Sequence, residues 1–296
     1  TLSFRIDYRP PFNWPLLRDF LGARAIPGVE AVVDDAYLRV VDIGDCRGWV
    51  RVAPNTKRSK TAINALNVTL SDSLQPVCMQ VVTRMKTVFD IRANGADIDS
   101  HLSNDKLLAP IVRRYAGMRL PGAFDGFELL LRAILGQQVS VKGATTLAGR
   151  CAQAFGETLA TPFESLISTS PRVERIADAR IDRIQRIGMP RKRAETIRTV
   201  ARQVVSGDIH LAPGVDPVVT GEQLMLIPGI GPWTADYVAM RALAWPDAFP
   251  VGDLGIKKAL GLNKASQIIE RSAQWRPWRA YAAMYLWLSL ATSSGG

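Results

Sequence analysis

The segment LIPGIGPWTADYVAM, residues 226–240, joins a glycine-rich turn to a helical pattern and contains no basic side chain. Gly229 and Gly231 flank one apolar residue, Ile230, and glycine permits the positive φ angles and close backbone approach that a tight turn needs. Pro232 suits the first turn of a following helix. Because N–H groups at a helix start form an anion site, the sequence predicts a turn that holds a phosphate with main-chain donors. An ordinary turn between two helices is the alternative.

The absence of a cation from this turn contrasts with the whole chain, in which 37 Lys and Arg against 27 Asp and Glu give a formal net charge of +10. Such an excess indicates a polyanionic partner, either nucleic acid or a membrane surface. Membrane-surface binding needs a basic amphipathic helix, and no segment stands out as one. No apolar run approaches the ~20 residues of a membrane span.

The cysteines and histidines predict neither a disulfide framework nor a metal site. Cys46, Cys78 and Cys151 lie far apart, which fits a reducing, cytosolic compartment. His101 and His210 are isolated, so we expect structural or solvated roles for both histidines. The start, TLSFRIDYRPPF, lacks the basic and apolar regions of a signal peptide. It begins with Thr rather than Met, as a piece of a longer polypeptide would.

The elements before residue 95 predict an α+β layer, an antiparallel sheet with helices on one face. Leu2, Phe4, Ile6 and Tyr8 alternate as in a half-buried strand, and a helix is expected after Pro15. Three further strands are expected in YLRVVDI, WVRVAP and TAINALNVTL, followed by a helix in SDSLQPVCMQVVTRMKTVF.

Beyond residue 95 the pattern is helical to about Leu290. Thr220 and Gln223 predict a capping box at the start of one helix, and the segment before it, APGVDPVV, is predicted as a loop. The final TSSGG is expected to be a mobile tail. The other predicted helices lie in FDGFELLLRAILGQQVS, VKGATTLAGRCAQAF, SPRVERIADA, IDRIQRIG and RKRAETIRTVARQVV.

Several segments in order along the chain carry a family resemblance. LIPGIGPWTADYVAMRAL followed by FPVGDLGIKKAL resembles the helix-hairpin-helix DNA glycosylase superfamily, and within it the AlkA-like family of 3-methyladenine DNA glycosylase II enzymes. The segments 10–25, 119–140, 187–197 and 275–287 are similar to further parts of that family. The resemblance therefore covers almost the whole chain.

This resemblance implies an α+β fold in which an N-terminal domain of antiparallel β-sheet and helices, residues 1–95, precedes an all-α core of two lobes. Residues 96–125 and 244–296 together form one lobe. Residues 126–243 form the other, which contains the helix-hairpin-helix motif at about 221–243. DNA is expected to bind in the cleft between the lobes.

The resemblance also implies a monofunctional DNA glycosylase that everts and hydrolytically excises alkylated bases, such as 3-methyladenine and 7-methylguanine, from duplex DNA in base excision repair. It makes Asp253, 20 residues after Trp233, the catalytic carboxylate, which would stabilise the positive charge that develops on the sugar and orient water. Asp253 would also suit the N-cap of a helix beginning at Leu254. Strand-nicking relatives carry Lys where this chain has Trp233, so we expect no lyase activity.

The expected base pocket consists of Trp233, Tyr237 and Trp287, with Phe20 and Trp14 contributing from the N-terminal domain. Trp233 and Tyr237 lie four residues apart, on one helix face. Electron-rich rings attract cationic alkylated bases at ~0.5–2 kcal/mol each. A shallow slot made of such rings discriminates weakly between bases, so we expect a broad substrate range. Burial of these aromatic rings in the core is the alternative interpretation.

The resemblance assigns DNA contacts to Gly229, Ile230, Gly231 and Thr234 of the hairpin, and to Gln138, which would fill the gap left by the everted base. Gln138 stands where some relatives carry Leu, and an exposed glutamine at a helix end is the alternative. Gly252 and Leu254 also depart from residues of some relatives, a second Asp and an aromatic. General steering of DNA is expected from Arg191, Lys192, Arg193, Lys257 and Lys258.

The resemblance implies no organic cofactor. An iron–sulfur cluster, which some relatives carry, is not expected, because no Cys lies beyond 151, and no other metal is expected. A structural monovalent cation on hairpin carbonyls, near Ile227, is the one addition that the resemblance suggests. Damaged double-stranded DNA is the expected partner of a bacterial-type cytoplasmic monomer that associates with the nucleoid, with no membrane and no obligate protein partner. Two rival functions stay open, a glycosylase for oxidised or deaminated purines and a non-catalytic module that binds damaged DNA.

Overall fold

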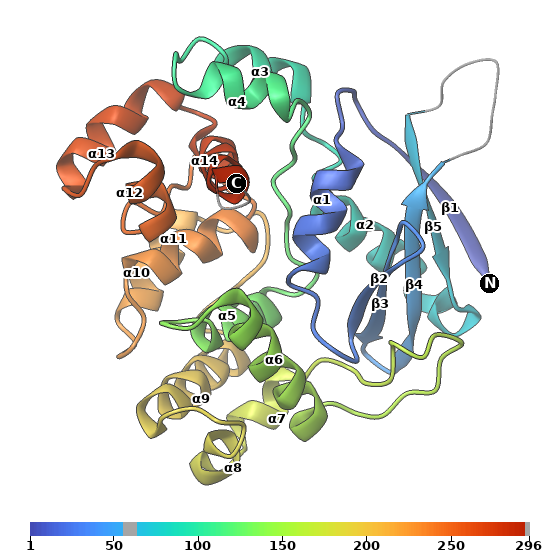
Figure 1. Ribbon diagram of the computed structural model, residues 1–296. Helices are drawn as coiled ribbons and strands as arrows, with labels where there is room; N and C mark the ends of the chain where they lie inside the picture. Colours follow the sequence, from blue (N-terminus) through green and yellow to red (C-terminus); the bar gives the residue numbers. More distant parts are fainter. Residues whose placement is uncertain (56–63, 294–296) are drawn as a thin grey trace.

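A computed structural model describes residues 1–55 and 64–293, and it places a β-sheet beside a larger group of helices (Figure 1). Residues 61–63 of the predicted strand TAINALNVTL and the last three residues of the TSSGG tail lie outside the described residues. Within the described parts of the chain, no helix combines the length and hydrophobicity needed to cross a bilayer.

Five antiparallel strands form the sheet, in the order β1-β5-β4-β3-β2. Their bounds are Leu2–Asp7 (β1), Glu30–Val33 (β2), Ala36–Ile43 (β3), Cys46–Pro54 (β4) and Ala65–Leu70 (β5). The sequence analysis missed β2, a four-residue edge strand. Asp34 and Asp35 join it to β3 with φ angles of 47° and 60°, the positive φ pair of a tight hairpin turn, which Asp tolerates.

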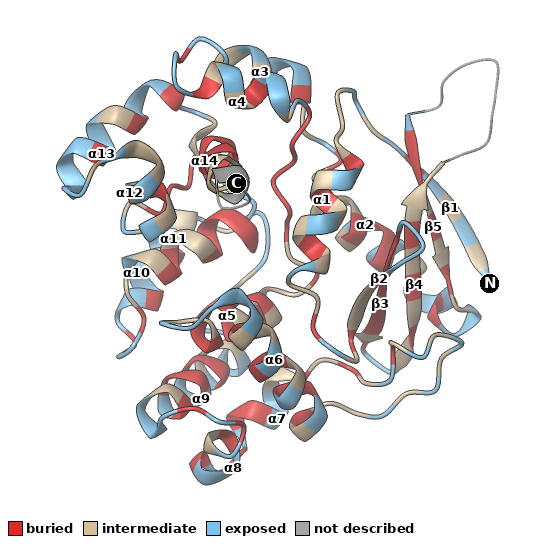
Figure 2. Cartoon of the chain, in the orientation of Figure 1, coloured by how far each residue is buried: buried red, intermediate tan, exposed pale blue. Residues whose placement is uncertain are grey.

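Helices α1 (Trp14–Gly22) and α2 (Cys78–Val88), with the short 3₁₀ helix η1 (Asp72–Val77), cover one face of the sheet. This confirms the predicted α+β layer. The other face is also covered near β3, where Leu38 and Val40 pack against Leu166 from a long connecting segment. Strand β3 is therefore buried along nearly its whole length (Figure 2).

The remaining helices form the all-helical core predicted from the sequence. One group consists of α3 (Gly95–Leu102), α4 (Leu108–Arg114), α12 (Leu254–Leu260), α13 (Ala265–Ser272), η2 (Ala273–Trp275) and α14 (Arg279–Ser293). The other group consists of α5 (Gly126–Leu135), α6 (Val141–Phe155), α7 (Val173–Ala177), α8 (Ile181–Gln185) and α9 (Arg191–Ser206). Helices α10 (Pro217–Met225) and α11 (Pro232–Arg241) pack against each other, and α11 also packs against α5. The domain boundaries at 95, 125 and 243 stay predictions.

The start of α10 differs from the sequence prediction. Asp216 is the N-cap, and its carboxylate accepts the N–H groups of Val218 and Val219. Residues 217–219 are therefore helical rather than part of a loop, and Thr220 is buried inside the helix instead of capping it. The physical reason is that Pro217 suits the first position after a cap, and Asp is at least as good a cap as Thr.

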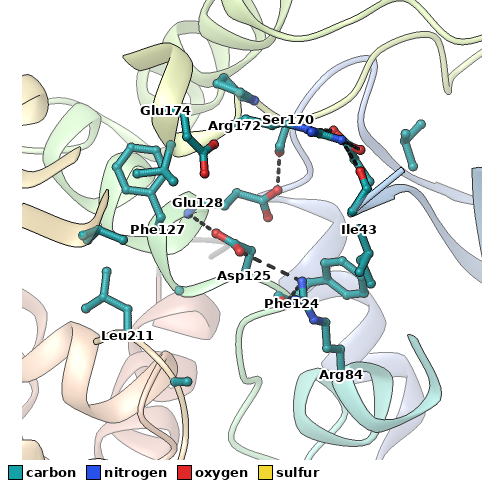
Figure 3. Close-up of a pocket in the computed structure, with 18 of the residues that line it drawn as sticks. Ile43, Arg84, Phe124, Asp125, Phe127, Glu128, Ser170, Arg172, Glu174 and Leu211 are labelled. Carbon is teal, nitrogen blue, oxygen red and sulfur yellow. Dashed lines mark hydrogen bonds and ion pairs between the residues drawn. The ribbon is translucent and has the colours of Figure 1, made fainter. Parts of the chain in front are cut away.

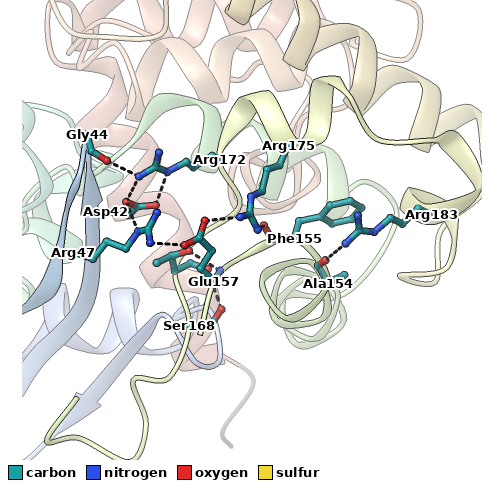
Figure 4. A network of polar contacts seen from close by, with 11 residues as sticks. Asp42, Gly44, Arg47, Ala154, Phe155, Glu157, Ser168, Arg172, Arg175 and Arg183 are labelled. Atoms are coloured by element: carbon teal, nitrogen blue, oxygen red, sulfur yellow. Dashed lines mark hydrogen bonds and ion pairs between the residues drawn. The ribbon is translucent and has the colours of Figure 1, made fainter. Parts of the chain in front are cut away.

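A network of ion pairs fixes the sheet to the helical core (Figure 4). Asp42 of β3 accepts two hydrogen bonds from Arg172, at 2.8 and 2.6 Å. Arg47 of β4 lies 3.3 Å from the same carboxylate and 2.5 Å from Glu157, which also pairs with Arg175. Because the pairs connect three chain segments, the sheet and the α6–α7 region are held in one orientation.

Candidate active site

Asp253 lies directly before α12 and caps it. Its Oδ1 accepts the N–H of Ile256 at 2.9 Å, so the capping role predicted from the sequence is confirmed. The residue is only half-buried. The cap fixes the side-chain rotamer and leaves the second carboxylate oxygen directed away from the helix end.

Two indole rings complete the surroundings of this carboxylate. Trp233 of α11 donates its Nε1–H to Oδ2 at 2.9 Å, and Trp287 of α14 donates its Nε1–H to Oδ1 at 2.9 Å. Three N–H groups from three helices therefore hold the two oxygens. An ionised carboxylate offers about four acceptor positions, so one position remains, on Oδ2.

Gly255, in the first turn of α12, lets the second indole approach this closely. A Cβ atom there would lie 3.1 Å from Cδ1 of Trp287 and 3.0 Å from Oδ1 of Asp253. Both distances are shorter than ordinary packing contacts between heavy atoms. A larger residue at 255 would push the ring or the carboxylate from its place.

The carboxylate and the indoles border a cavity of about 400 Å³, within the range of ligand pockets. The rings of Trp233 and Tyr237 stack in one wall, with centroids 5.2 Å apart and planes within 10°. The cavity lies between the two groups of helices, and it is lined by Arg24, Arg132, Ala133, Gly136, Val139, Val141, Ala144, Trp233, Tyr237, Asp253, Gly255 and Trp287.

Positive charge surrounds the tyrosine of this wall. Arg241 donates to the Tyr237 hydroxyl at 2.7 Å, and Arg24 and Arg132 line the cavity beside it. Burial alone raises the pKa of Tyr237, but the three guanidinium groups outweigh burial and lower that pKa below its ordinary value. The sequence analysis missed these arginines. The signal for Arg132 was a single charge inside the otherwise apolar segment LLLRAIL.

Of the two N-terminal aromatic residues expected in the pocket, neither lines the cavity. Trp14 is buried in the core under the sheet, where its indole N–H bonds to Asp35. The structure therefore separates Trp14 from the cavity. Phe20 lies nearer, because Arg24 stacks on its ring at 3.7 Å and Arg241 lies 5.1 Å from the ring centroid. Phe20 thus supports the arginines behind the cavity wall.

The glycine-rich turn joins α10 to α11 beside this cavity. Gly229 has φ of +95°, and a Cβ atom there would lie 2.3 Å from Oγ1 of Thr196, so no other residue fits without a shift. Gly231 occupies the cap position of α11 and has no side chain to cover the first N–H groups. Ile230 and Thr234 are buried. The Thr234 hydroxyl accepts a hydrogen bond inside the protein, so any contact of this residue with DNA is left to its backbone.

Gln138 lies in the loop between α5 and α6, where it is exposed and has φ of +58°, a conformation uncommon outside glycine. Its neighbours Val139 and Val141 line the cavity and are 41% and 47% exposed. The side chain of Gln138 is thus presented to solvent at the rim of the aromatic cavity.

A second cavity, of about 460 Å³, lies at the opposite end of α5 (Figure 3). Asp125 caps α5 by accepting the N–H of Glu128, and Arg84 lies 4.0 Å from Asp125. Glu128 in turn accepts hydrogen bonds from Arg39, at 2.6 Å, and from Ser170. These charged groups are engaged with one another and anchor α5 to the sheet. The aromatic cavity, with its carboxylate, is the better candidate for chemistry.

Comparison with known proteins places the chain among DNA repair proteins. Residues 3–125 match the AlkA N-terminal domain, and residues 131–273 match the HhH-GPD superfamily of base excision DNA repair proteins. The chain is 34% identical over 284 residues to DNA-3-methyladenine glycosylase 2 of Escherichia coli, with 96% of each chain covered. It is also 34% identical to a probable bifunctional transcriptional activator/DNA repair enzyme AlkA of Mycobacterium tuberculosis, of whose length it spans 57% while 98% of this chain is covered.

A solved structure shows the same fold. The 3-methyladenine DNA glycosylase of Archaeoglobus fulgidus matches with a TM-score of 0.79 at 20% identity, over 99% of this chain and 100% of that chain. The sheet domain and the helical core therefore recur together.

Proposed function

Because the chain belongs to the HhH-GPD superfamily of base excision DNA repair proteins and carries an AlkA N-terminal domain, it excises alkylated bases from DNA, and we propose that it does so as a monofunctional glycosylase. Asp253 is the catalytic carboxylate in this proposal, and water is the nucleophile. The observation that carries the proposal is the Asp253 carboxylate, held by three N–H groups in the wall of the aromatic cavity.

The fixed carboxylate suits the breaking of an N-glycosidic bond. Departure of the base leaves positive charge on the deoxyribose, and a preorganised negative group stabilises that charge more than it stabilises the intact nucleotide. The free acceptor position on Oδ2 can also take a proton from, or orient, the attacking water. Trp233 stands at the position where strand-nicking relatives carry Lys, so the motif offers no amine for covalent attack on the sugar.

The everted base would enter between the stacked pair Trp233–Tyr237 and the ring of Trp287. Cation–π attraction favours cationic 3-methyladenine and 7-methylguanine there. The guanidinium groups of Arg24 and Arg132 oppose this attraction by charge repulsion, and they offer donors to acceptor atoms on a neutral base. Since these two effects oppose each other, we expect a broad range of substrates rather than strict selection of cationic bases.

The DNA backbone would be held by main-chain N–H groups of Gly229, Ile230 and Gly231 and of the first turn of α11, a contact that ignores base sequence. Gln138, exposed beside the cavity, would fill the space left by the everted nucleotide. Binding of the phosphate, filling of the gap and cleavage of the bond would then take place at neighbouring positions in and around one cavity.

We further propose that the protein acts as a monomer in the cytoplasm and needs no organic cofactor. A monovalent cation near the Ile227 carbonyl is compatible with the turn, because that oxygen accepts the N–H of Ile230 at 3.0 Å and retains a second lone pair. Such a cation would add positive charge near the bound phosphate. Affinity for duplex DNA in potassium chloride against tetramethylammonium chloride at equal ionic strength tests this cation proposal.

The main test is base release from duplex DNA methylated with dimethyl sulfate, analysed by chromatography, followed by gel analysis of the strands. We expect release of 3-methyladenine and 7-methylguanine, with strands that break only after hot alkali. Strand cleavage without alkali would contradict the monofunctional mechanism. Binding without release would favour the damage-binding module, and release of only 8-oxoguanine or hypoxanthine from matched duplexes would favour the other glycosylase.

A further inference from the structure

Gln137, beside the exposed Gln138, directs its side chain to the hairpin instead of to solvent. Its Nε2 donates to the carbonyl oxygen of Gly229 at 3.0 Å and lies 3.2 Å from Oγ1 of Thr234. The first acceptor belongs to the glycine-rich turn and the second to the first turn of α11. A single amide group therefore connects the α5–α6 loop both to the turn and to the helix that follows it.

Helix α9 also forms hydrogen bonds with the α5–α6 loop and with the hairpin. Arg193 donates to the backbone carbonyl of Gln137 at 2.8 Å. One turn later, Thr196 donates its hydroxyl to the carbonyl of Pro228 at 2.7 Å. The loop and the hairpin are thus each fixed to α9 and are joined to each other by the Gln137 amide. Each of the three segments, the α5–α6 loop, the hairpin and α9, therefore contacts the other two.

The backbone conformation at Gln138 explains why contacts of the neighbouring Gln137 matter for the orientation of Gln138. Gln138 has a positive φ, so its side chain departs from the path of Gln137 and Val139. A residue in this conformation is held there by its surroundings, at a cost of order 1–3 kcal/mol for a non-glycine residue. The contacts of the neighbouring Gln137 with the hairpin and with α9 supply such a constraint.

We propose that Gln137 is a positioning residue that couples the phosphate-holding hairpin to the gap-filling residue Gln138, so that seating of the DNA backbone and filling of the stack occur together. This inference rests on the proposed function. Gln137 touches neither the base nor the sugar in this account. It acts through the orientation of Gln138, and its loss should therefore impair base eversion more than binding of DNA already open at the lesion.

The test uses Gln137→Met, which keeps the chain length and removes the amide, with Gln153→Met on the exposed face of α6 as the matched control. The readouts are single-turnover release of 7-methylguanine and fluorescence of 2-aminopurine placed opposite the lesion, which reports loss of stacking. We expect Gln137→Met to slow release about tenfold, the fold-change of one hydrogen bond, and to reduce the fluorescence change. Affinity for a duplex with an abasic-site analogue should change less than threefold, and Gln153→Met should match wild type.

The decisive comparison is made in a Gln138→Ala background. If Gln137 acts through Gln138, Gln137→Met has little further effect on the release rate in this background. If Gln137 has only a general structural role, the rate losses of the two substitutions multiply. Thr234→Val, which removes one acceptor on the hairpin side, must show the same pattern, so the conclusion does not depend on one variant. Multiplying effects, or no effect of Gln137→Met in the wild-type background, would overturn the proposal. Failure of wild type to release any base would instead refute the proposed function.

Discussion

Replacement of Asp253 by Asn tests whether the negative charge or only the shape of this side chain matters. The hydrogen bonds determine how the amide must sit. Oδ1 accepts from both Ile256 and Trp287, so the amide oxygen will take this position and keep two donors. The NH₂ group must then occupy the Oδ2 position, 2.9 Å from the indole N–H of Trp233, where two donors face each other.

The size of both effects follows from this geometry. Asn caps a helix about as well as Asp, so the cap itself costs little. The lost hydrogen bond from Trp233 to a charged acceptor should lower the free energy of unfolding by about 1.5–3 kcal/mol. The rate of base release should fall by about 10²–10³, because the substitution removes a preorganised charge and the one free acceptor position.

A second substitution separates the two effects. Trp233→Phe removes the opposing donor, so in that background Asp253→Asn should cost less than about 0.5 kcal/mol of stability, a strong departure from additivity. Trp287→Phe is the matched control, since the amide oxygen still serves the cap and the clash with Trp233 persists. The release rate should stay low in every variant with Asn at 253.

Chemical denaturation gives the stabilities, and single-turnover release of 7-methylguanine from duplex DNA gives the rates. The reasoning fails if release recovers together with stability in the Asp253→Asn/Trp233→Phe variant, because geometry rather than charge would then limit the rate. It also fails if Asp253→Asn alone stays within tenfold of wild type.

Three further substitutions probe stability, cavity shape and charge. Burial raises the pKa of Asp90 from 3.8 to about 6, so the contribution of this residue to stability is full below pH 4 and is lost as the pH rises through 6. Asp90→Asn, which keeps the hydrogen bond from Tyr281, should therefore raise the free energy of unfolding by up to about 3 kcal/mol at pH 8 and leave it unchanged at pH 4. Equal gains at both pH values in denaturant titrations would contradict this. Gly255→Ala should leave the unfolding midpoint within a few degrees of wild type but slow base release about tenfold or more by displacing Trp287, and an unchanged single-turnover rate would show that the crowding is harmless. Arg132→Gln removes a charge from the cavity wall and should raise release of cationic 7-methylguanine relative to neutral hypoxanthine about tenfold in a competition assay, whereas an unaltered ratio would mean that this charge does not reach the base.

The fold was predictable where one periodicity dominates a segment. Alternation at Leu2, Phe4 and Ile6 indicated β1, and the helical spacing in FELLLRAIL indicated α5. The prediction failed where elements are short or where two signals compete. Strand β2 has only four residues, and Asp216 with Pro217 defined the start of α10 in place of Thr220.

The site was predictable only in part, for reasons that depend on distance in three dimensions. Spacing placed Trp233 and Tyr237 on one helix face, and the structure stacks their rings. Arg24 reaches the cavity from a segment more than 200 residues earlier in the sequence than this pair, which no local pattern shows. Trp14 could have been excluded, since it shares the spacing of Leu17 and Leu21, at i, i+3 and i+7, and so belongs to the apolar face of α1.

The indoles of Trp233 and Trp287 combine two functions that sequence reasoning had kept apart. Their rings border the cavity, and their N–H groups hold the carboxylate of Asp253, which lies 20 residues from one and 34 from the other. A base that displaces either ring therefore also moves the carboxylate that stabilises the developing charge in the proposed mechanism. Binding of the base and alignment of the carboxylate are linked through the same two side chains. A poorly fitting normal base would therefore be bound with a misaligned carboxylate, and its glycosidic bond would be cleaved slowly. In such a site, discrimination would arise in the rate of bond cleavage rather than in affinity, which suits the broad substrate range proposed for this cavity.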